Sequence, residues 1–408
     1  MPPATPVSPP LDTPLPDPTL PKSFPLEAPF TDASNPPIPP SAAVATAAAA
    51  ASGAAAAPAA AVRSSQRPLI VRFGAMGDMV MMTTLVRALS SRYASQVDIL
   101  SSGPWTVPLL ANQPGVGTIH LLKNRSLPFF FSKEQRTLVE ALKRRGPGPT
   151  WYGDTDDKCL PLLHRAGIGD DLICNARDLP LDDGEHLIEY WQRFARVSPS
   201  AGAAGSIKDI VDEAPRLLVP RQDLELLDQW LVARGLDARQ LLLIQPGNKR
   251  TMRRGLRRRP SNTKWWPETR WASVVQSLAE MHPQAAILLL GVPQEHELNE
   301  EIIALAGVGN AVNLACDLPI RRLLALQSRA SAMISVDTGP AHSAAAVGCP
   351  VLVLFGVADP VRISPRSATG SPIRYLSGHA GNGASILGIS VEQVLRQWQD
   401  LPKRPVNC

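Results

Sequence analysis

The sequence has little of what marks several common kinds of protein. Aromatic residues make up only 5% of its 408 residues, and it has five cysteines. These are Cys159, Cys174, Cys316, Cys349 and Cys408. None belongs to a CxxC pair or a Cys/His cluster, which argues against a disulfide framework or a zinc site. Free thiols in a reducing cytosol fit the pattern better.

Two nucleotide-binding signatures and a membrane helix are also missing. The turn Gly74–Asp78 lacks the third glycine of a GxGxxG fingerprint, and no GK[ST] follows it as in a P-loop. Residues 41–62 carry almost no charge over about the length of a membrane span, but they are mostly alanine, interrupted by Gly53 and Pro58. Without large apolar side chains or a cationic start, we expect neither a spanning helix nor a secretory signal.

Proline, in contrast, is abundant and unevenly placed. Sixteen of the 41 prolines lie between Pro2 and Pro58. Proline-dense sequence cannot build helix or sheet ladders, and few large apolar side chains are present there to offset the entropy of ordering. We therefore expect residues 1–66 to form a disordered tail ahead of the folded part of the chain.

The rest of the chain alternates between strand and helix patterns. Leu69–Phe73 is a short apolar run, a glycine turn follows it, and Met79–Ser91 has apolar residues near helical spacing. The order repeats after a linking helix predicted at Asp223–Ala233. The later strands are predicted at Leu241–Ile244, Ala285–Leu290, Ala332–Val336 and Val351–Phe355. Further helices are predicted at Trp271–Met281, Glu295–Leu305, Ala341–Val347 and Val391–Gln399.

Continuous apolar strands between helices are typical of parallel sheets covered on both faces. The pattern predicts an α/β protein with two Rossmann-like, doubly wound domains that face a cleft, at residues 67–222 and 223–408. Ligands of such sheets bind beyond the carboxyl ends of the strands. Glycine and polar residues follow the predicted strand ends, namely Gly77, Asp78, Gly247, Gly291, Asp337, Thr338, Gly339 and Gly356. A site is therefore expected there.

Two of these strand ends allow two interpretations each. After Asp337, Pro340 is predicted to be the first helical residue, and free N–H groups at a helix start suit phosphate, with His342 on the same turn. Capping by Thr338 without any ligand explains the string equally well. Asp78 is either an N-terminal cap or a general base that faces the cleft.

A cationic cluster lies between the predicted strands of the second half. Lys264 precedes Trp265-Trp266-Pro267, where it is either a solvated lysine or a cation beside rigid apolar surface. Seven of the eleven residues in Lys249–Arg259 are basic. Such a run could attract phosphates, nucleic acid or an anionic membrane face. Without interleaved aromatics or a nucleic-acid-binding motif, we expect no nucleic-acid partner.

Three separated strings resemble glycosyltransferase family 9, which includes the ADP-heptose:lipopolysaccharide heptosyltransferases. They are Leu69–Leu89, Pro246–Glu295 outside its basic run, and Ser335–Pro360. Together they cover most of residues 68–370, and the third string is the most specific. The resemblance implies a GT-B fold and an inverting, metal-independent transfer that needs no cofactor besides its nucleotide-sugar donor substrate.

On this resemblance Asp78 is the base that takes the proton from the acceptor hydroxyl. Lys264 is the second catalytic residue, and it would stabilise the leaving nucleoside diphosphate together with the amides of Thr338 and Gly339. Four residues would complete the donor site: Gly247, Glu295 at the ribose hydroxyls, Asp337 at the donor sugar, and His342 near the phosphates.

The implied partners are ADP-heptose as donor and a glycolipid acceptor, the lipopolysaccharide core. The implied location is cytoplasmic, with peripheral contact to the anionic inner face of the membrane through Lys249–Arg259. Seventeen positions separate Gly247 from Lys264, more than is usual in the family. The alternatives left open are another donor, a protein acceptor, a non-catalytic nucleotide-sugar-binding protein, and a nucleic-acid-associated protein built around the basic run.

Overall fold

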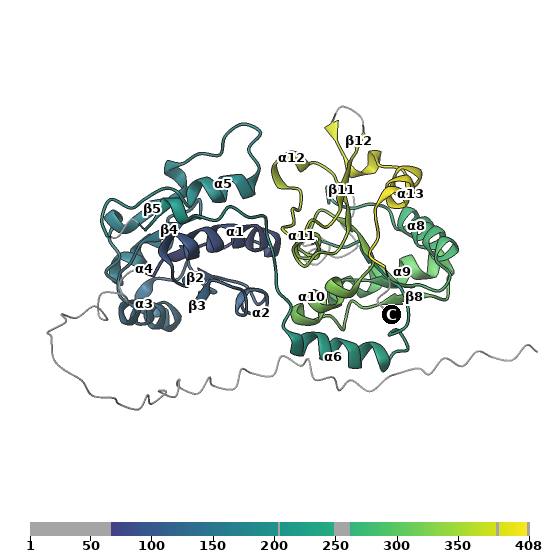
Figure 1. The fold of residues 1–408 in the computed structure, drawn as a ribbon, viewed down its shortest axis with the longest axis horizontal. Coiled ribbons are helices and arrows are strands. Elements are labelled where there is room, and N and C mark those ends of the chain that lie inside the picture. The colour runs from purple at the N-terminus through teal and green to yellow at the C-terminus, as the bar shows by residue number, and fades with distance from the viewer. Residues whose placement is uncertain (1–66, 203–204, 249–261, 381–382, 406–408) are drawn as a thin grey trace, which may run out of the picture. The chain divides into compact units, whose positions relative to one another are not determined.

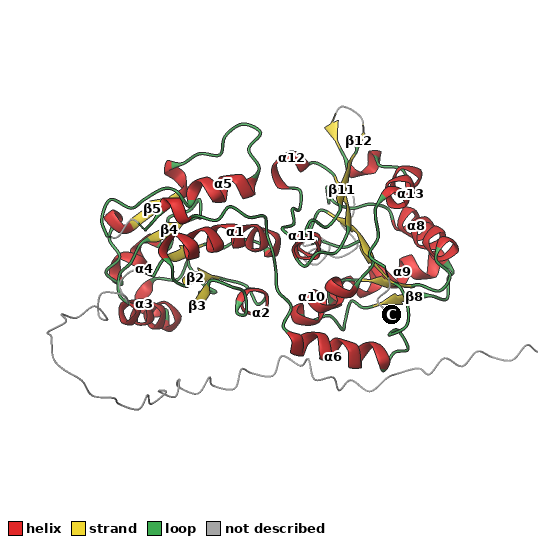
Figure 2. Cartoon of the chain, viewed as in Figure 1, coloured by secondary structure: helices red, strands yellow, loops and turns green. Residues whose placement is uncertain are grey.

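The computed structural model describes residues 67–202, 205–248, 262–380 and 383–405 (Figure 1). The predicted tail at 1–66 and the basic run Lys249–Arg259 lie outside the described residues. The described chain contains two separate parallel sheets, each accompanied by helices (Figure 2). This confirms the prediction of two doubly wound α/β domains.

The first sheet has five parallel strands in the order β3-β2-β1-β4-β5. The strands are β1 (Leu69–Val71), β2 (Val97–Ser101), β3 (Val116–Leu121), β4 (Thr150–Tyr152) and β5 (Ile173–Asn175). Its helices are α1 (Met76–Tyr93), α2 (Thr106–Leu110), α3 (Lys133–Arg145), α4 (Leu160–Arg165) and α5 (Leu187–Phe194). The order reverses between β1 and β4, which makes that point the expected crevice of this sheet.

The second sheet has six parallel strands in the order β11-β10-β9-β6-β7-β8. The strands are β6 (Leu241–Gln245), β7 (Ala286–Leu289), β8 (Ala311–Asn313), β9 (Ala332–Val336), β10 (Val351–Phe355) and β11 (Ile373–Ser377). Its helices are α6 (Arg221–Val232), α8 (Glu268–Met281), α9 (His296–Ala306), α10 (Ile320–Arg329), α11 (Gly339–Ala346), α12 (Pro360–Ile363) and α13 (Val391–Asp400). A hairpin of β12 (His379–Ala380) and β13 (Gly383–Ala384) follows β11.

The helix starts differ from prediction in a regular way. α1 and α8 each begin three residues before the predicted start, and α11 begins two before. The first turns hold glycine, proline or charged residues, so the apolar periodicity begins only where the helix meets the core. The prediction for Pro340 was also wrong by one place, because Gly339 is the first helical residue and Pro340 the second.

Helix α1 joins the two halves of the chain. It is apolar on most of its faces, as expected of a helix buried all round, and it packs with its own sheet and with Ala346 of α11 in one core. Two polar interactions also link residues 67–222 to residues 223–408. The Leu217 amide donates to Ala346 O at 2.9 Å, and Arg366 pairs with Glu189 at 2.8 Å. Among the described helices, none is both long and apolar enough to cross a membrane.

Candidate active site

The strand order of the second sheet reverses between β6 and β9. The chain runs outward from β6 through β7 and β8, then returns beside β6 at β9 and continues through β10 and β11. Loops that leave neighbouring strands in opposite directions open a crevice at their carboxyl ends. Gly247 follows β6 and Asp337 follows β9, so both predicted donor-site residues lie at this point.

A lysine and an aspartate form an ion pair at this edge. Lys264 Nζ lies 2.5 Å from Asp337 Oδ2 and donates to Asp337 O at 2.8 Å. Asp337 is buried and Lys264 is about one third exposed, at 34%. Burial alone would raise the pKa of Asp337, but nearby His342 and the charge and hydrogen bond of Lys264 outweigh it and hold that pKa below its ordinary value. The carboxylate is therefore ionised at neutral pH, and the ammonium remains reachable from solvent.

Glu295 occupies a slot between two glycines. A Cβ on Gly247 would lie 2.2 Å from Glu295 Oε1, and one on Gly291 would lie 3.2 Å from Oε2. The carboxyl is 3% exposed and accepts a hydrogen bond from the Val292 amide at 3.1 Å. Burial raises the pKa of Glu295 to about 7, against the lowering effects of the Val292 amide and Gln245. Protonation of this group therefore changes near neutral pH.

We expect Glu295 to make stability fall as the pH rises from about 4.5 to about 7. In that window the folded chain keeps a proton that the unfolded chain loses, so the unfolded state gains from each added pH unit. The effect amounts to about 3 kcal/mol across the window. Glu295→Gln should remove it, which denaturant unfolding of both proteins at several pH values will show.

Two further comparisons sharpen this measurement. His186, whose pKa burial lowers to about 4, acts in the opposite direction over part of the window, so the informative quantity is the difference between wild type and variant at each pH. With Glu295 in its expected role at the ribose hydroxyls, ADP binding should strengthen above pH 7 in the wild type only, since an ionised carboxylate would accept from those hydroxyls. Titration of the nucleotide's own phosphate is common to both proteins. A constant difference in stability across the window would contradict the proposed pKa.

The start of α11 meets the start of α1. A Cβ on Gly339 would lie 2.8 Å from Met76 Cβ and 3.2 Å from the Gly77 amide nitrogen, and one on Gly77 would lie 2.9 Å from His342 Cδ2. Only glycine permits this approach. Thr338 precedes α11 in extended conformation and makes no side-chain cap bond. The positive ends of two helix dipoles thus converge beside Lys264, His342 and Asp337, which suits an anion.

Asp78 is the third residue of α1 and is half-buried. Its Oδ2 accepts a hydrogen bond from the Ala75 amide at 2.9 Å, which closes the first turn of the helix. The sequence suggested Asp78 as the N-cap residue, but Ala75 occupies that position, and Asp78 closes the turn from inside the helix instead. The carboxylate also lies one residue from Gly77, at the point where the two helix starts meet. Capping and a base role use the same group and do not exclude each other.

A second carboxylate at the first sheet was not predicted. Asp154 follows β4 at the crevice between β1 and β4, and it accepts from the Phe73 amide at 3.1 Å and from Arg125 Nη1 at 2.9 Å. Arg72 Nη1 lies 3.5 Å from the same carboxylate. The signal was available, since Gly153-Asp154 ends a strand as Gly77-Asp78 follows one. It was missed because β4 has only three residues and follows a glycine- and proline-rich stretch.

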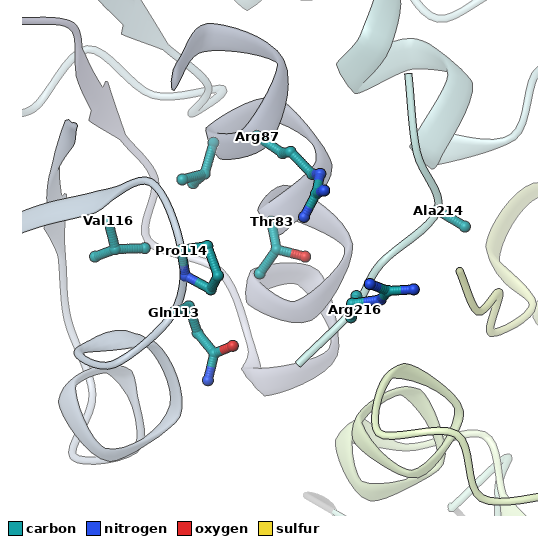
Figure 3. A pocket seen from close by; sticks show the side chains of 8 residues that line it. Thr83, Arg87, Gln113, Pro114, Val116, Ala214 and Arg216 are labelled. Atoms are coloured by element: carbon teal, nitrogen blue, oxygen red, sulfur yellow. The ribbon is translucent and has the colours of Figure 1, made fainter. Parts of the chain in front are cut away.

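A separate small pocket lies beside α1, away from these groups (Figure 3). Thr83 and Arg87 of α1 line it together with Gln113, Pro114 and the crossing segment at Arg216. Two of its polar side chains have partners. Gln113 exchanges two hydrogen bonds with the Leu218 backbone, and Arg87 pairs with Glu213. None of the predicted site residues contributes to it, so we assign it to the packing of the linking segment.

Two Rossmann-like domains whose carboxyl edges meet define the class of GT-B proteins, and solved structures confirm this fold. Escherichia coli ADP-heptose lps heptosyltransferase II superposes with a TM-score of 0.63 at 21% identity, covering 82% of this chain and 98% of that one. The E. coli heptosyltransferase WaaC with ADP gives 0.60 at 18% identity, covering 82% and 99%.

Sequence comparison points to the same group of proteins. Residues 240–379 match the model of glycosyltransferase family 9 (heptosyltransferase). Lipopolysaccharide heptosyltransferase 2 of Salmonella typhimurium is 23% identical over 364 residues, covering 82% of this chain and 97% of the relative. The chain is therefore a heptosyltransferase-like enzyme, and its residues 240–379 are similar to glycosyltransferase family 9. The matched range contains Lys264, Glu295, Asp337, Thr338, Gly339 and His342, and Asp78 lies before it.

Proposed function

We propose that this enzyme transfers a heptose from ADP-heptose to a lipopolysaccharide core or a related glycan, with inversion and without a metal ion or cofactor. The relatives' names support the sugar and the acceptor, and the complex of one structural neighbour with ADP supports the nucleotide. The observation that carries the proposal is the meeting of the α1 and α11 starts, which brings Asp78 close to an anion site with its own lysine.

In the proposed reaction Asp78 removes the proton from an acceptor hydroxyl as that oxygen attacks the anomeric carbon of the donor. The bond from that carbon to the diphosphate oxygen breaks on the opposite face, which inverts the configuration. Negative charge grows on the departing ADP. Lys264 and the amides at the start of α11 stabilise this charge, a task that a metal ion performs in other transferases. The proton remains on Asp78 until it passes to solvent.

In the proposed donor site, Glu295 and Gly247 bind the nucleotide and Asp337 binds the sugar. His342, in contact with Gly77, would lie near the phosphates. We also propose a cytoplasmic enzyme that works at the inner membrane, where a glycolipid acceptor is found. Contact through Lys249–Arg259 stays a prediction, because that run lies outside the described residues.

Calorimetric titration with ADP-, UDP- and GDP-sugars tests the donor assignment. We expect binding of the ADP-sugar and its loss in Gly247→Ala, because the added methyl would collide with the Glu295 carboxyl. Gly309→Ala is the matched control, since a Cβ there meets nothing within 4 Å. Failure of every nucleotide sugar to bind would contradict a transferase. Preference for a UDP- or GDP-sugar would be consistent with a glycosyltransferase but would contradict the assignment of ADP-heptose as the donor.

A further inference from the structure

Three large apolar side chains stand out from one short segment of the first domain. Leu127 is 47% exposed, Phe130 is 77% exposed and Phe131 is 84% exposed. The two phenylalanines lie on the single turn Phe129–Phe131 between β3 and α3. The chain has only eight phenylalanines, and most large apolar residues in its described part are buried or half-buried. We call residues 123–136 the Phe130 loop.

The backbone beneath these side chains is firmly tied. Gln135 is buried, and its side-chain amide donates to Asn124 O at 3.1 Å and to Leu127 O at 2.9 Å. Ser132 caps α3 by accepting from the Gln135 amide at 3.2 Å. Glu134 accepts from the amides of Lys123 at 2.7 Å and Asn124 at 3.3 Å. These bonds hold the loop in a shape that keeps Phe130 and Phe131 outside the core.

Cations surround the exposed phenylalanines. Lys123, Lys133 and Arg136 are exposed within the loop, and Arg136 donates to Phe130 O. Arg165 of α4 is also exposed, and its guanidinium lies 4.7 Å from the Phe129 ring centroid. The only carboxylate within the loop, Glu134, already accepts from backbone amides. Apolar tips within a positive rim match an anionic bilayer, whose headgroups attract cations and whose interface accepts aromatic rings.

The loop also adjoins the acceptor side of the candidate site. Arg125 Nη1 reaches Asp154 at 2.9 Å, and its guanidinium lies 4.2 Å from the Phe73 ring centroid. Phe73 directly precedes the turn that leads to Asp78, and Asp154 accepts from its amide. A membrane held by the Phe130 loop would therefore lie against the same sheet edge as the proposed base.

We propose that the Phe130 loop docks the enzyme on an anionic phospholipid surface, with Phe130 and Phe131 inserted into the interface and the surrounding cations on the headgroups. The proposal draws on the proposed function only in taking the acceptor to be a membrane lipid. The composition of the loop favours a bilayer over a protein as the partner. A stable protein interface needs a larger apolar core and fewer lysines than this loop presents.

Co-sedimentation with vesicles of phosphatidylcholine, with and without phosphatidylglycerol, tests the proposal on the full chain. We expect binding to the anionic vesicles and at least about a tenfold lower partition for Phe130→Ser/Phe131→Ser, since each ring loses its apolar contact. Lys123→Glu/Lys133→Glu should lose the preference for anionic vesicles. Leu305→Ser, which removes a 52% exposed apolar side chain from α9, is the matched control and should bind as the wild type does.

Each outcome separates docking from catalysis. Titration with ADP verifies that both double variants keep the donor site, which lies in the other domain. Equal vesicle binding by wild type and Phe130→Ser/Phe131→Ser overturns the proposal, because the membrane would then be held elsewhere. Absence of vesicle binding by the wild type also overturns it and leaves the surface to a protein partner. If the wild type binds anionic vesicles but not ADP, the result contradicts the proposed function and leaves the docking proposal intact.

Discussion

Asp78→Asn is expected to reduce turnover by roughly 10²–10⁴-fold, the usual contribution of a positioned general base, while ADP-sugar binding stays unchanged. The amide oxygen of asparagine can still accept the hydrogen bond from the Ala75 amide, so the first turn of α1 keeps its closure. The amide cannot take up the proton of an acceptor hydroxyl. This substitution therefore separates the two roles of one side chain, by removing the base and keeping the cap.

Asp78→Ala supplies the comparison. It removes both the base and the hydrogen bond, so we expect the same loss of turnover and a free energy of unfolding lower by about 1 kcal/mol. Turnover is measured as ADP release with acceptor present, and stability by denaturant unfolding. If Asp78→Asn turns over at the wild-type rate, Asp78 is only a cap, and another group acts as the base.

Apolar runs along the chain predicted the parts of the fold with strong periodic signals. β9 and β10 have the predicted bounds, and β6 is longer by one residue. These strands lie in the middle of their sheet and are buried on both faces, so every residue except Gln245 is apolar or small. β4, β5 and β8 were not predicted because three residues are too few to show a period. The five-residue strand β11 was not predicted either, because Arg374 and Tyr375 interrupt its apolar residues.

Gly247, Asp337, Thr338 and Gly339 were predicted from their place after strands, and the donor-site roles of Lys264 and Glu295 came from the family resemblance. The contacts among these residues could not be predicted. Lys264 and Asp337 are 73 positions apart in sequence, and no periodicity relates them. The contact of Gly77 with His342 depends on how closely two helices from different domains approach each other. Small side chains allow such an approach, but their presence in the sequence does not predict it. Exposure of Phe130 was equally hidden, because three consecutive phenylalanines favour a buried strand when the sequence is considered alone.

Lys264→Met is expected to lower turnover by roughly 10²–10³-fold, because the departing diphosphate loses a cation that acts as charge develops. It should also reduce the free energy of unfolding by about 2 kcal/mol, since the buried Asp337 carboxylate is left without its partner; the value is discounted because Lys264 is one third exposed. Lys143→Met, which breaks an exposed pair with Glu140, is the matched control and should change neither quantity measurably.

The double variant Lys264→Met/Asp337→Asn decides what the lysine does. Asp337, whose pKa is held below its ordinary value, contributes stability above the unfolded pKa of about 3.8 and loses it as the pH falls through the folded value. Removing both charges abolishes this dependence, so stability at neutral pH should return. Turnover should stay low, because neither change restores a cation to the diphosphate and Asp337→Asn also alters the proposed contact with the donor sugar. Recovery of turnover together with stability would show that Lys264 only neutralises Asp337 and that the leaving group depends on the helix start alone.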